Sequence, residues 1–317
     1  MAKITSSVFF AVLLGLFLHM ASAHAQYVRT CVSARGDDAN TCHCSQPCRT
    51  FQRAHDQTLD QGEVTVLDPG GYGPVTISKS ISSVNDGVGE ASIQVSGGGV
   101  GITVSAGAAA YVNLRGITIQ GVDTVCCGTG LVFNSGFSLT MTNCVVRNIV
   151  GTGIFFRPTA STNLSLSNTL VADNGGNGII VFPTGSLTVK AEFNRVEAYN
   201  NSGNGIFVDA EAMFVGSLNA TIVESVAHNN SLYGFAVTAQ AGNPLTNLMV
   251  VRSVTANNAT GLLANGQNAT LRIGESTVTG NTTSWSTTFG GVLRSYGDNN
   301  IDGNADANPA PTTIVKK

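Results

Sequence analysis

The amino-acid sequence predicts an all-β chain that folds as a parallel β-helix, a solenoid of about 8–10 coils with a short disulfide-stapled N-terminal cap. The first observation is a repeat, because residues 139–181 hold one unit of about 25 residues written twice. The second is that each unit contains three short extended runs bounded by Gly and Asn. The third is that these units lack helical periodicity. Three strands per coil and no helix indicate a β-solenoid.

The composition supports this fold class and excludes others. Only 11% of the 317 residues are charged, whereas an ordinary globular domain has roughly 25%. A disordered chain would combine high charge with low hydrophobicity, but 43% of these residues are hydrophobic. The net charge is −3, and no basic patch indicates a nucleic-acid partner.

Residues 1–25 have the pattern of a secretory signal peptide. Lys3 is the charged start, residues 8–18 are apolar, and Ala23-His24-Ala25 is a small-x-small cleavage site. The apolar run is too short to span a bilayer. We therefore expect an exported protein, in the periplasm, outside the cell or at its surface, with no membrane span after cleavage.

Residues 26–60 do not follow the repeat and are expected to form the N-terminal cap. Four cysteines fall within 18 residues, namely Cys31, Cys42, Cys44 and Cys48. In an exported chain this spacing favours two disulfides over a zinc site, with three connectivities possible. Residues 47–59 have a helical pattern, which predicts a short helix in the cap. A solenoid needs such a cover because its first coil would otherwise expose its core and strand edges.

Residues 61–296 are expected to form the β-helix, with three inward-facing columns of apolar side chains. Aligning the units on a Gly followed by a large apolar residue gives spacings of 23–30 residues. The first column is Ile102, Leu131, Ile154, Ile179, Ile206, Phe235, Leu262 and Val292. The second is Leu139 with Met141, Leu164 with Leu166, Leu248 with Val250, and Leu271 with Ile273. The third is Val145, Leu170, Val196, Val226 and Val254.

A corner must separate the second column from the third. Asn143, Asn168 and Asn194 fall there in successive coils, and Asn tolerates a left-handed backbone better than other non-glycine residues. The coil around residues 189–193 is one residue out of register, which predicts a β-bulge near residues 190–192. Residues 297–317 break the pattern and are expected to be a C-terminal cap or tail.

The Gly-x-Gly-[Ile/Leu] units with Asn corners resemble the right-handed parallel β-helix repeats of the pectin lyase-like superfamily. The segments Pro47-Cys-Arg-Thr-Phe-Gln52 and Gly62-Glu-Val-Thr-Val-Leu-Asp68 are similar to the entry segment of exported bacterial proteins of that kind. The resemblance covers residues 45–300 and implies a right-handed coil. It does not imply one activity, because that superfamily includes lyases, hydrolases, epimerases, tailspikes and adhesins.

The candidates for catalysis are charged residues on neighbouring coils. Hydrolysis of a glycosidic bond needs two carboxyl groups, and lyase chemistry needs acidic calcium ligands with a basic residue. The chain offers Asp173, Glu192, Arg195, Glu197 and His228 for these roles, although the polygalacturonase motifs do not occur in its coils. Glu224, Arg252 and Glu275 follow in the corner column with alternating charge. That alternation favours an exposed charge ladder over a catalytic group.

The candidates for ligand binding lie on an outward apolar column. The residue after each inward residue of the first column should point outward, yet this series is Thr103, Val132, Phe155, Ile180, Phe207, Ala236, Leu263 and Leu293. Three explanations stay open: cover by the tail or by a long loop (209–219 or 238–247), a dimer face, or a platform for sugar rings. The next column holds Arg157 and Asp209, which are expected to line the same surface.

Residues 298–306 partly match a calcium loop. Asp298, Asn300, Asp302 and Asp306 are the candidate oxygen ligands, although Pro309 stands where a bidentate Glu is expected. Apart from this possible calcium, no cofactor is expected.

The sequence as a whole favours an exported, non-catalytic scaffold that binds a polysaccharide or a cell-surface glycan. One alternative is a lyase or glycoside hydrolase that acts on uronate-rich glycans. The other is an adhesive or structural protein with a protein partner, or a homo-oligomer formed through the apolar stripe.

Overall fold

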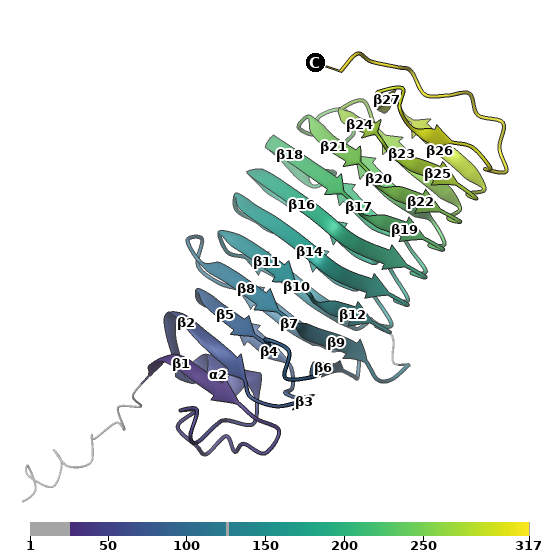
Figure 1. The fold of residues 1–317 in the computed structure, drawn as a ribbon. Helices are drawn as coiled ribbons and strands as arrows, with labels where there is room; N and C mark the ends of the chain where they lie inside the picture. The colour runs from purple at the N-terminus through teal and green to yellow at the C-terminus, as the bar shows by residue number, and fades with distance from the viewer. Residues whose placement is uncertain (1–25, 125–126, 317) are drawn as a thin grey trace, which may run out of the picture.

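The computed structural model describes residues 26–124 and 127–316, and these residues form one rod of stacked coils (Figure 1). The expected signal peptide (1–25) and residues 125, 126 and 317 lie outside the described residues. Every strand pairing within the rod is parallel, which confirms the β-solenoid. The described residues contain no helix that is long and apolar enough to cross a membrane.

Three rows of strands form the walls of the rod. The first row is a nine-stranded sheet. Its strands are β4 (Val75–Ile77), β7 (Val100–Ser105), β10 (Thr129–Ser135), β13 (Ile154–Phe156), β15 (Ile179–Val181), β17 (Ile206–Asp209), β20 (Tyr233–Thr238), β23 (Thr260–Asn265) and β26 (Thr283–Thr288).

The second and third rows join at a corner into one 19-stranded sheet, because β14 and β16 run through that corner. The second row is β1 (Tyr27–Val32), β2 (Thr58–Val66), β5 (Ile81–Val84), β8 (Tyr111–Arg115), β11 (Ser138–Thr142), β14 (Thr162–Ala172), β16 (Gly185–Tyr199), β18 (Met213–Val223), β21 (Thr246–Val251), β24 (Ala269–Gly274) and β27 (Val292–Ser295). The third row is β3 (Gly70–Gly71), β6 (Ala91–Val95), β9 (Ile117–Gly121), β12 (Val145–Arg147), the ends of β14 and β16, β19 (Val226–His228), β22 (Val254–Ala256), β25 (Thr277–Thr279) and β28 (Asn300–Ile301).

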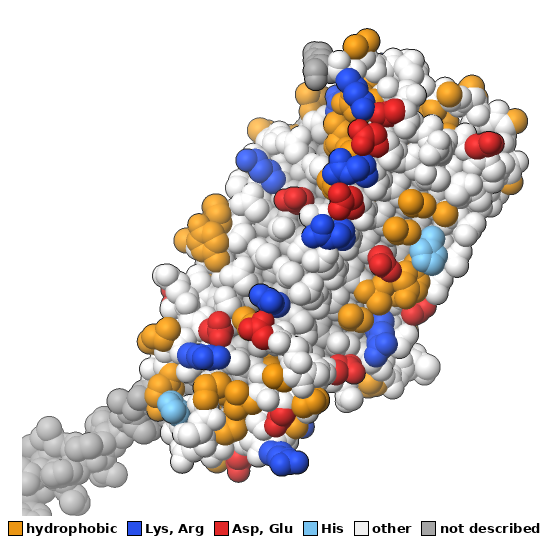
Figure 2. All heavy atoms as spheres, viewed as in Figure 1, with side chains coloured by type: hydrophobic (Ala, Val, Ile, Leu, Met, Phe, Trp, Pro, Cys, Tyr) orange, Lys and Arg blue, Asp and Glu red, His pale blue; other side chains and the backbone are white. Residues whose placement is uncertain are grey.

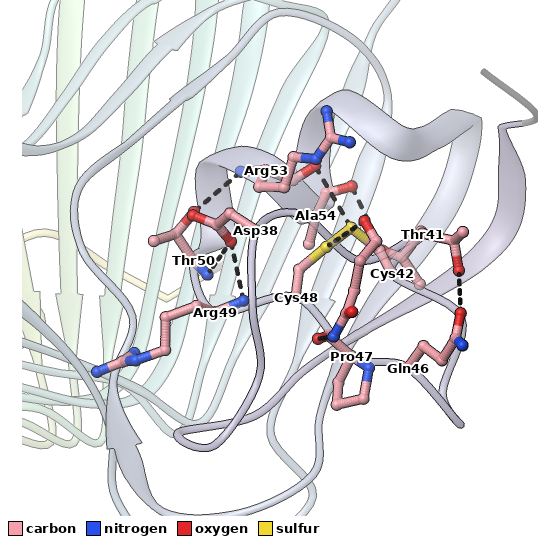
Figure 3. Close-up of a disulfide and its surroundings, with 12 residues drawn as sticks. Asp38, Thr41, Cys42, Gln46, Pro47, Cys48, Arg49, Thr50, Arg53 and Ala54 are labelled. Carbon is pink, nitrogen blue, oxygen red and sulfur yellow. Dashed lines mark hydrogen bonds between the residues drawn. A yellow bond between two sulfur atoms is a disulfide. The ribbon is translucent and has the colours of Figure 1, made fainter. Parts of the chain in front are cut away.

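The N-terminal segment closes the first coil with a strand, a helix and two disulfides. The disulfides join Cys31 to Cys44 and Cys42 to Cys48, which confirms that these cysteines pair with one another and settles the connectivity. The helix α2 (Phe51–Gln57) begins at Thr50, whose hydroxyl accepts the Arg53 N–H. Asp38 holds this turn in place, because its carboxylate accepts the N–H groups of Arg49 and Thr50 and the Thr50 hydroxyl (Figure 3).

The core fills the inside of the rod with stacked apolar side chains. The first and second predicted columns are buried as expected, except at Val292. Trp285 occupies that last place in the first column, because β26 rather than β27 stacks on β23. The rings of Phe133 and Phe156 stack with centroids 4.5 Å apart, which shows how closely neighbouring coils pack.

The third predicted column is displaced by one residue. Val145, Leu170, Val226 and Val254 point outward, whereas Val196, which lies one position earlier in its coil, is buried as expected. The buried residues of this row are Ile119, Val146, Val171, Ala198, Ala227, Thr255 and Val278. The reason is the corner: its residue is left-handed, and the residue that follows already points inward, so the alternation resumes one place earlier than expected.

The first corner is a column of left-handed residues. Asn143 and Asn168 have positive φ as expected, but the third member is Arg195 (φ 52°) and not Asn194, which pairs with Ser167. The pairing of residues 162–167 with 189–194 is continuous, so the predicted bulge is absent. The coil is in register once Arg195 is taken as its corner, because Val189, Ala191 and Phe193 pair with Thr162, Leu164 and Leu166. Gly116 begins the column, and Glu224, Arg252 and Glu275 continue it.

Charges of alternating sign stabilise this corner. Glu224 lies 3.5 Å from Arg195 and 3.3 Å from Arg252, and Arg195 Nε donates to Asn168 Oδ1 at 2.6 Å. Figure 2 shows the alternation as a row of blue and red side chains. The predicted charge ladder is therefore confirmed. Each exposed pair contributes about 0–1 kcal/mol, whereas the left-handed backbone costs about 1–2 kcal/mol at a non-glycine residue.

A second corner carries a buried amide ladder. The left-handed residues here are Asn148, Asp173, Asn200, Asn229, Asn257, Gly280 and Gly303. From the second coil of this series onward, the following residue is a buried Asn, namely Asn174, Asn201, Asn230, Asn258 and Asn281, with the half-buried Asn304 at the end. Each amide NH₂ donates to the next amide oxygen at 2.9–3.0 Å. The same oxygens also accept backbone N–H groups, so the ladder satisfies the backbone where the chain turns.

Breaking the amide ladder should destabilise the whole rod. Asn230→Ala removes the acceptor of the Asn201 N–H and the donor to the Ala198 carbonyl and to Asn258 Oδ1. Because these groups are buried, we expect the free energy of unfolding to fall by about 2–5 kcal/mol. Asn219→Ala is the matched control, because Asn219 belongs to an exposed amide pair with Asn247. Denaturant unfolding followed by circular dichroism measures both. Equal losses in the two variants would contradict this role.

The left-handed backbone at the first corner predicts the order of stability among substitutions at Glu224. Glu224→Gly and Glu224→Ala both remove the two ion pairs, but only Gly adopts the left-handed backbone without strain. We expect the Gly variant to be more stable than the Ala variant by about 1 kcal/mol. Unfolding midpoints at low and high salt check this, since the ladder contribution should also fade with salt. A more stable Ala variant would overturn the assignment.

Candidate functional site

The outward face of the first row carries a cluster of aromatic and charged side chains. We call it the phenylalanine face, and it comprises Phe155, Arg157, Ile180, Phe182, Phe207 and Asp209 from β13, β15, β17 and the residues that follow them. Phe155, Ile180 and Phe207 stand in one column, because they pair directly in successive coils. Arg157, Phe182 and Asp209 stand in the next column, since each follows the inward residue of its strand.

Stacking fixes the geometry of this face. The Phe155 and Phe182 ring centroids lie 6.4 Å apart, and the Arg157 guanidinium carbon lies 5.3 Å from the Phe155 centroid. Arg157 Nε also donates to Asn134 Oδ1 at 2.9 Å. The guanidinium is thus held over the ring in a cation–π contact with further donors directed outward. The three phenylalanine rings are half-buried, so part of each stays accessible.

The predicted stripe is correct for seven of its eight members. Thr103, Val132, Phe155, Ile180, Phe207, Ala236 and Leu263 form one outward column. Leu293 is wrong, because it lies in the second row and points inward against Leu271, and Ser286 takes its place. Phe182 was missed, although its position two residues after Ile180 matches that of Arg157 after Phe155.

The C-terminal segment does not follow this column. It pairs instead with the last coils, where the Ser295 N–H donates to the Thr312 carbonyl and Trp285 Nε1 donates to the Pro309 carbonyl. The loop at 240–243 packs against the loop at 211–213 through the Asn243 amide. Three members of the column, Val132, Ala236 and Leu263, are nevertheless buried, so only part of the stripe is accessible.

Asp209 is the buried carboxyl group of this face. Only 6% of its surface is exposed, and it accepts the Glu211 N–H at 2.9 Å. Burial raises the pKa of Asp209 to about 6, and the hydrogen bond from Glu211 opposes part of that rise. Perturbed pKa values cluster at functional sites, which makes this buried carboxyl group beside half-buried aromatic rings a candidate functional group.

The five catalytic candidates are spread over two faces and two corners. Glu192 lines a cavity of about 460 Å³ on the second row together with Lys190. Arg195 lies in the first corner and Glu197 on the third row. Asp173 lies in the second corner, where its carboxylate accepts the Asn200 amide at 3.0 Å. His228 stacks on Tyr199 with centroids 4.7 Å apart. The structure does not bring these groups to one point.

The calcium candidates are likewise held by separate partners. Asp298 contacts Lys316 and the Glu275 N–H, whereas Asp306 accepts the N–H and hydroxyl of Ser284. Asn300 pairs with Thr277, and Asp302 accepts the Gly303 N–H. Among residues 26–124 and 127–316, no three His, Cys, Asp or Glu side chains are grouped to hold a metal ion.

Comparison with known proteins identifies the family. The model of the right-handed β-helix region matches residues 71–196 and 101–273, which is more than half of the chain. The chain belongs to the right-handed β-helix family. No curated protein sequence matches it.

Solved structures share the fold of this β-helix protein. Pectate lyase Pel9A aligns with a TM-score of 0.62 at 15% identity, over 90% of this chain and 77% of that one. A rhamnogalacturonan lyase gives 0.52 at 15% identity, over 80% and 76%. The A-module of mannuronan C-5 epimerase AlgE4 from Azotobacter vinelandii gives 0.50 at 14% identity, over 81% and 91%. Identities this low show the fold alone.

The raised pKa of Asp209 predicts a pH-dependent stability. As pH rises from about 4 to about 6, the unfolded state ionises before the folded state, so folding becomes less favourable. Asp209→Asn removes this penalty and keeps an acceptor for the Glu211 N–H. We expect the variant to be more stable than the parent by about 1–3 kcal/mol near pH 7 and equal to it near pH 4.

Thermal unfolding at the two pH values measures this difference. Asp173→Asn is the control, since the exposed Asp173 carboxylate should give no comparable gain on going to neutral pH. A gain in Asp209→Asn that is the same at both pH values would show that burial of the charge is not its cause.

Proposed function

We propose that this β-helix protein is exported and binds an acidic or neutral polysaccharide along the phenylalanine face without cleaving it. The observation that carries the proposal is the column of half-exposed rings with Arg157 stacked over Phe155. Aromatic rings pack on the apolar faces of sugar rings, and a guanidinium donates hydrogen bonds to hydroxyl or carboxylate oxygens.

The spacing of the rings suits an extended chain that runs along the rod. Coils stack at about 4.8 Å, so Phe155 and Phe207 lie about 10 Å apart across two coils. That span accommodates neighbouring sugar rings of one polymer. The disulfides of the cap and the signal-like residues 1–25 support an oxidising location outside the cytoplasm. Two of the similar structures are lyases of pectate and of rhamnogalacturonan, which supports polysaccharide as the ligand class.

One observation favours a second candidate, a lyase or glycoside hydrolase. Asp209 has the pKa that a general acid or base needs near neutral pH, and it follows Phe207 by two residues. The charge of Glu211, which follows β17, adds to the raised pKa of Asp209, so a second carboxyl group lies near it. An adhesive protein with a protein partner would use the same face without any affinity for glycans.

Retardation in gels that contain pectate, alginate or a neutral glucan tests binding. We expect at least one polysaccharide to retard the parent, and Phe155→Ala and Phe207→Ala to weaken that binding by about tenfold each, since about 1.4 kcal/mol per ring is lost. Phe214→Ala is the control, because Phe214 is 70% exposed on the second row.

Mass spectrometry of the same polysaccharides, incubated with and without calcium, separates binding from catalysis. Intact polymer with the parent protein is the expected result. Oligosaccharide products that disappear in Asp209→Asn would make the protein an enzyme. Absence of retardation by every polysaccharide, or equal weakening by Phe214→Ala, would reject the binding proposal.

A further inference from the structure

The helix of the cap covers an open edge of the first row. In the nine-stranded sheet β4 is the end strand and pairs with β7 on one side. The helix α2 packs against β4 and also against β1 and β2 (Figure 1). An end strand leaves a row of backbone N–H and C=O groups without a strand partner, and such an edge pairs readily with other extended chains. The helix therefore covers the edge on which a preceding strand would pair.

Two side chains of α2 accept the N–H groups of this edge. Gln52 Oε1 accepts the Thr76 N–H at 2.8 Å, and His55 Nε2 accepts the Ser78 N–H at 3.2 Å. Thr76 belongs to β4, and Ser78 directly follows that strand. Buried backbone N–H groups need an acceptor, so these two side chains do for β4 what the neighbouring coil does for a strand inside the rod.

The hydrogen bond from Ser78 fixes the protonation state of His55. A backbone N–H can only donate, so Nε2 of the imidazole must carry a lone pair and the ring proton must be on Nδ1. Nδ1 lies 3.1 Å from Asp56 Oδ1, which accepts a hydrogen bond from it. Only 4% of the His55 surface is exposed. The ring is thus held neutral by its contacts, and a second proton on Nε2 would place two donors face to face.

Burial and charge also favour the neutral ring. Burial is the largest cause that lowers the pKa of His55 below its ordinary value of 6.5, the Asp56 carboxylate opposes it, and the Lys79 ammonium lowers the pKa further. A base whose pKa is lower in the folded state contributes stability above its unfolded pKa, and this stability is lost as the pH falls. Acid therefore favours any state in which the ring reaches water.

Among the described residues of β1, β2 and β4, the remaining charged groups have other partners. β4 contains no charged residue, and Arg29 of β1 lies 3.4 Å from Glu63 of β2. Asp60 of β2 acts on the charge of Lys79, whose ammonium donates to the Thr58 carbonyl. The neighbouring carboxylate of α2 and this ammonium are thus the charges that act on the imidazole.

We propose that the cap is an acid-sensitive cover, in which a proton taken up by His55 Nε2 breaks the hydrogen bond from Ser78 and releases α2 from the β4 edge. The step forms one N–H bond on the imidazole, which becomes a cation, and no other covalent bond changes. The two disulfides still tie residues 42–48 to β1, so the helix opens without leaving the molecule and can close again when the pH rises. The device is independent of the phenylalanine face.

Hydrogen exchange of the disulfide-bonded protein, resolved by mass spectrometry, tests this proposal at about pH 7 and about pH 5. The segments to compare are 50–58, which spans α2, and 75–80, which holds the β4 edge. After correction for the intrinsic effect of pH on exchange, we expect both to exchange about tenfold faster at the lower pH, because the Ser78 N–H loses its acceptor. The segment 246–251 in β21 is the internal reference and should not change.

Three variants identify the group that titrates. His55→Gln cannot gain a charge, so its exchange in both segments should be the same at the two pH values. Asp56→Asn removes the charge that favours the protonated ring, so its faster exchange should begin at a lower pH than in the parent. His43→Gln is the control, because His43 is an exposed histidine of the same cap and its loss should leave the response unchanged.

Equal exchange of the two cap segments at both pH values in the parent would overturn the proposal, and so would a response that His55→Gln retains. An equal rise in the β21 segment would show acid unfolding of the whole rod instead of release of α2. Should His55→Gln fail to fold, an unshifted response in Asp56→Asn would overturn the proposal. None of these readouts involves a polysaccharide, so failure here and failure of the proposed function can be told apart.

Discussion

The rest of the structure depends on one constraint, the left-handed residue at the first corner of each coil. It bends the strand between the second and third rows, and the residue after it already faces the core. This inward residue fixes the alternation along the third row, and so decides which of its residues point outward. Because Glu and Arg occupy this position as well as Asn and Gly, the corner carries a strain that the rod must offset elsewhere. The charge ladder offsets only part of it, since its members are exposed.

Buried Ser hydroxyls accept backbone N–H groups at the first corner, and the buried amide ladder does the same at the second. Its amides bond to one another and to backbone groups that no strand would satisfy, so each coil fixes the turn of the next. Strict stacking is the consequence, and it creates the surfaces of the molecule. Residues about one coil apart in sequence become direct neighbours, as Phe155, Ile180 and Phe207 do. The phenylalanine face exists only because this register is kept.

Periodicity was enough to predict the fold, the first two core columns and the outward apolar stripe, because each depends on residue type at a fixed spacing. Periodicity was not enough to assign the corner residue or the inward residues of the third row, because a shift of one residue changes both assignments. The sequence suggested Asn194 for the corner on residue type, whereas the backbone places Arg195 there. The third column failed for the same reason. Asp209 was found by its position, but its raised pKa depends on burial, which no sequence pattern reveals.

Outward positions differ from inward ones in what they reveal about function. An inward side chain must fill the rod, so Phe193 or Phe235 is explained by packing. An outward side chain takes no part in stacking the backbone, and a polar residue there leaves the coil intact, as Thr238 and Asn265 show in the column of Arg157 and Asp209. The fold therefore does not require apolar rings at such positions. On a rod whose walls accept polar residues, apolar rings at outward positions are therefore the candidates for contact with a ligand.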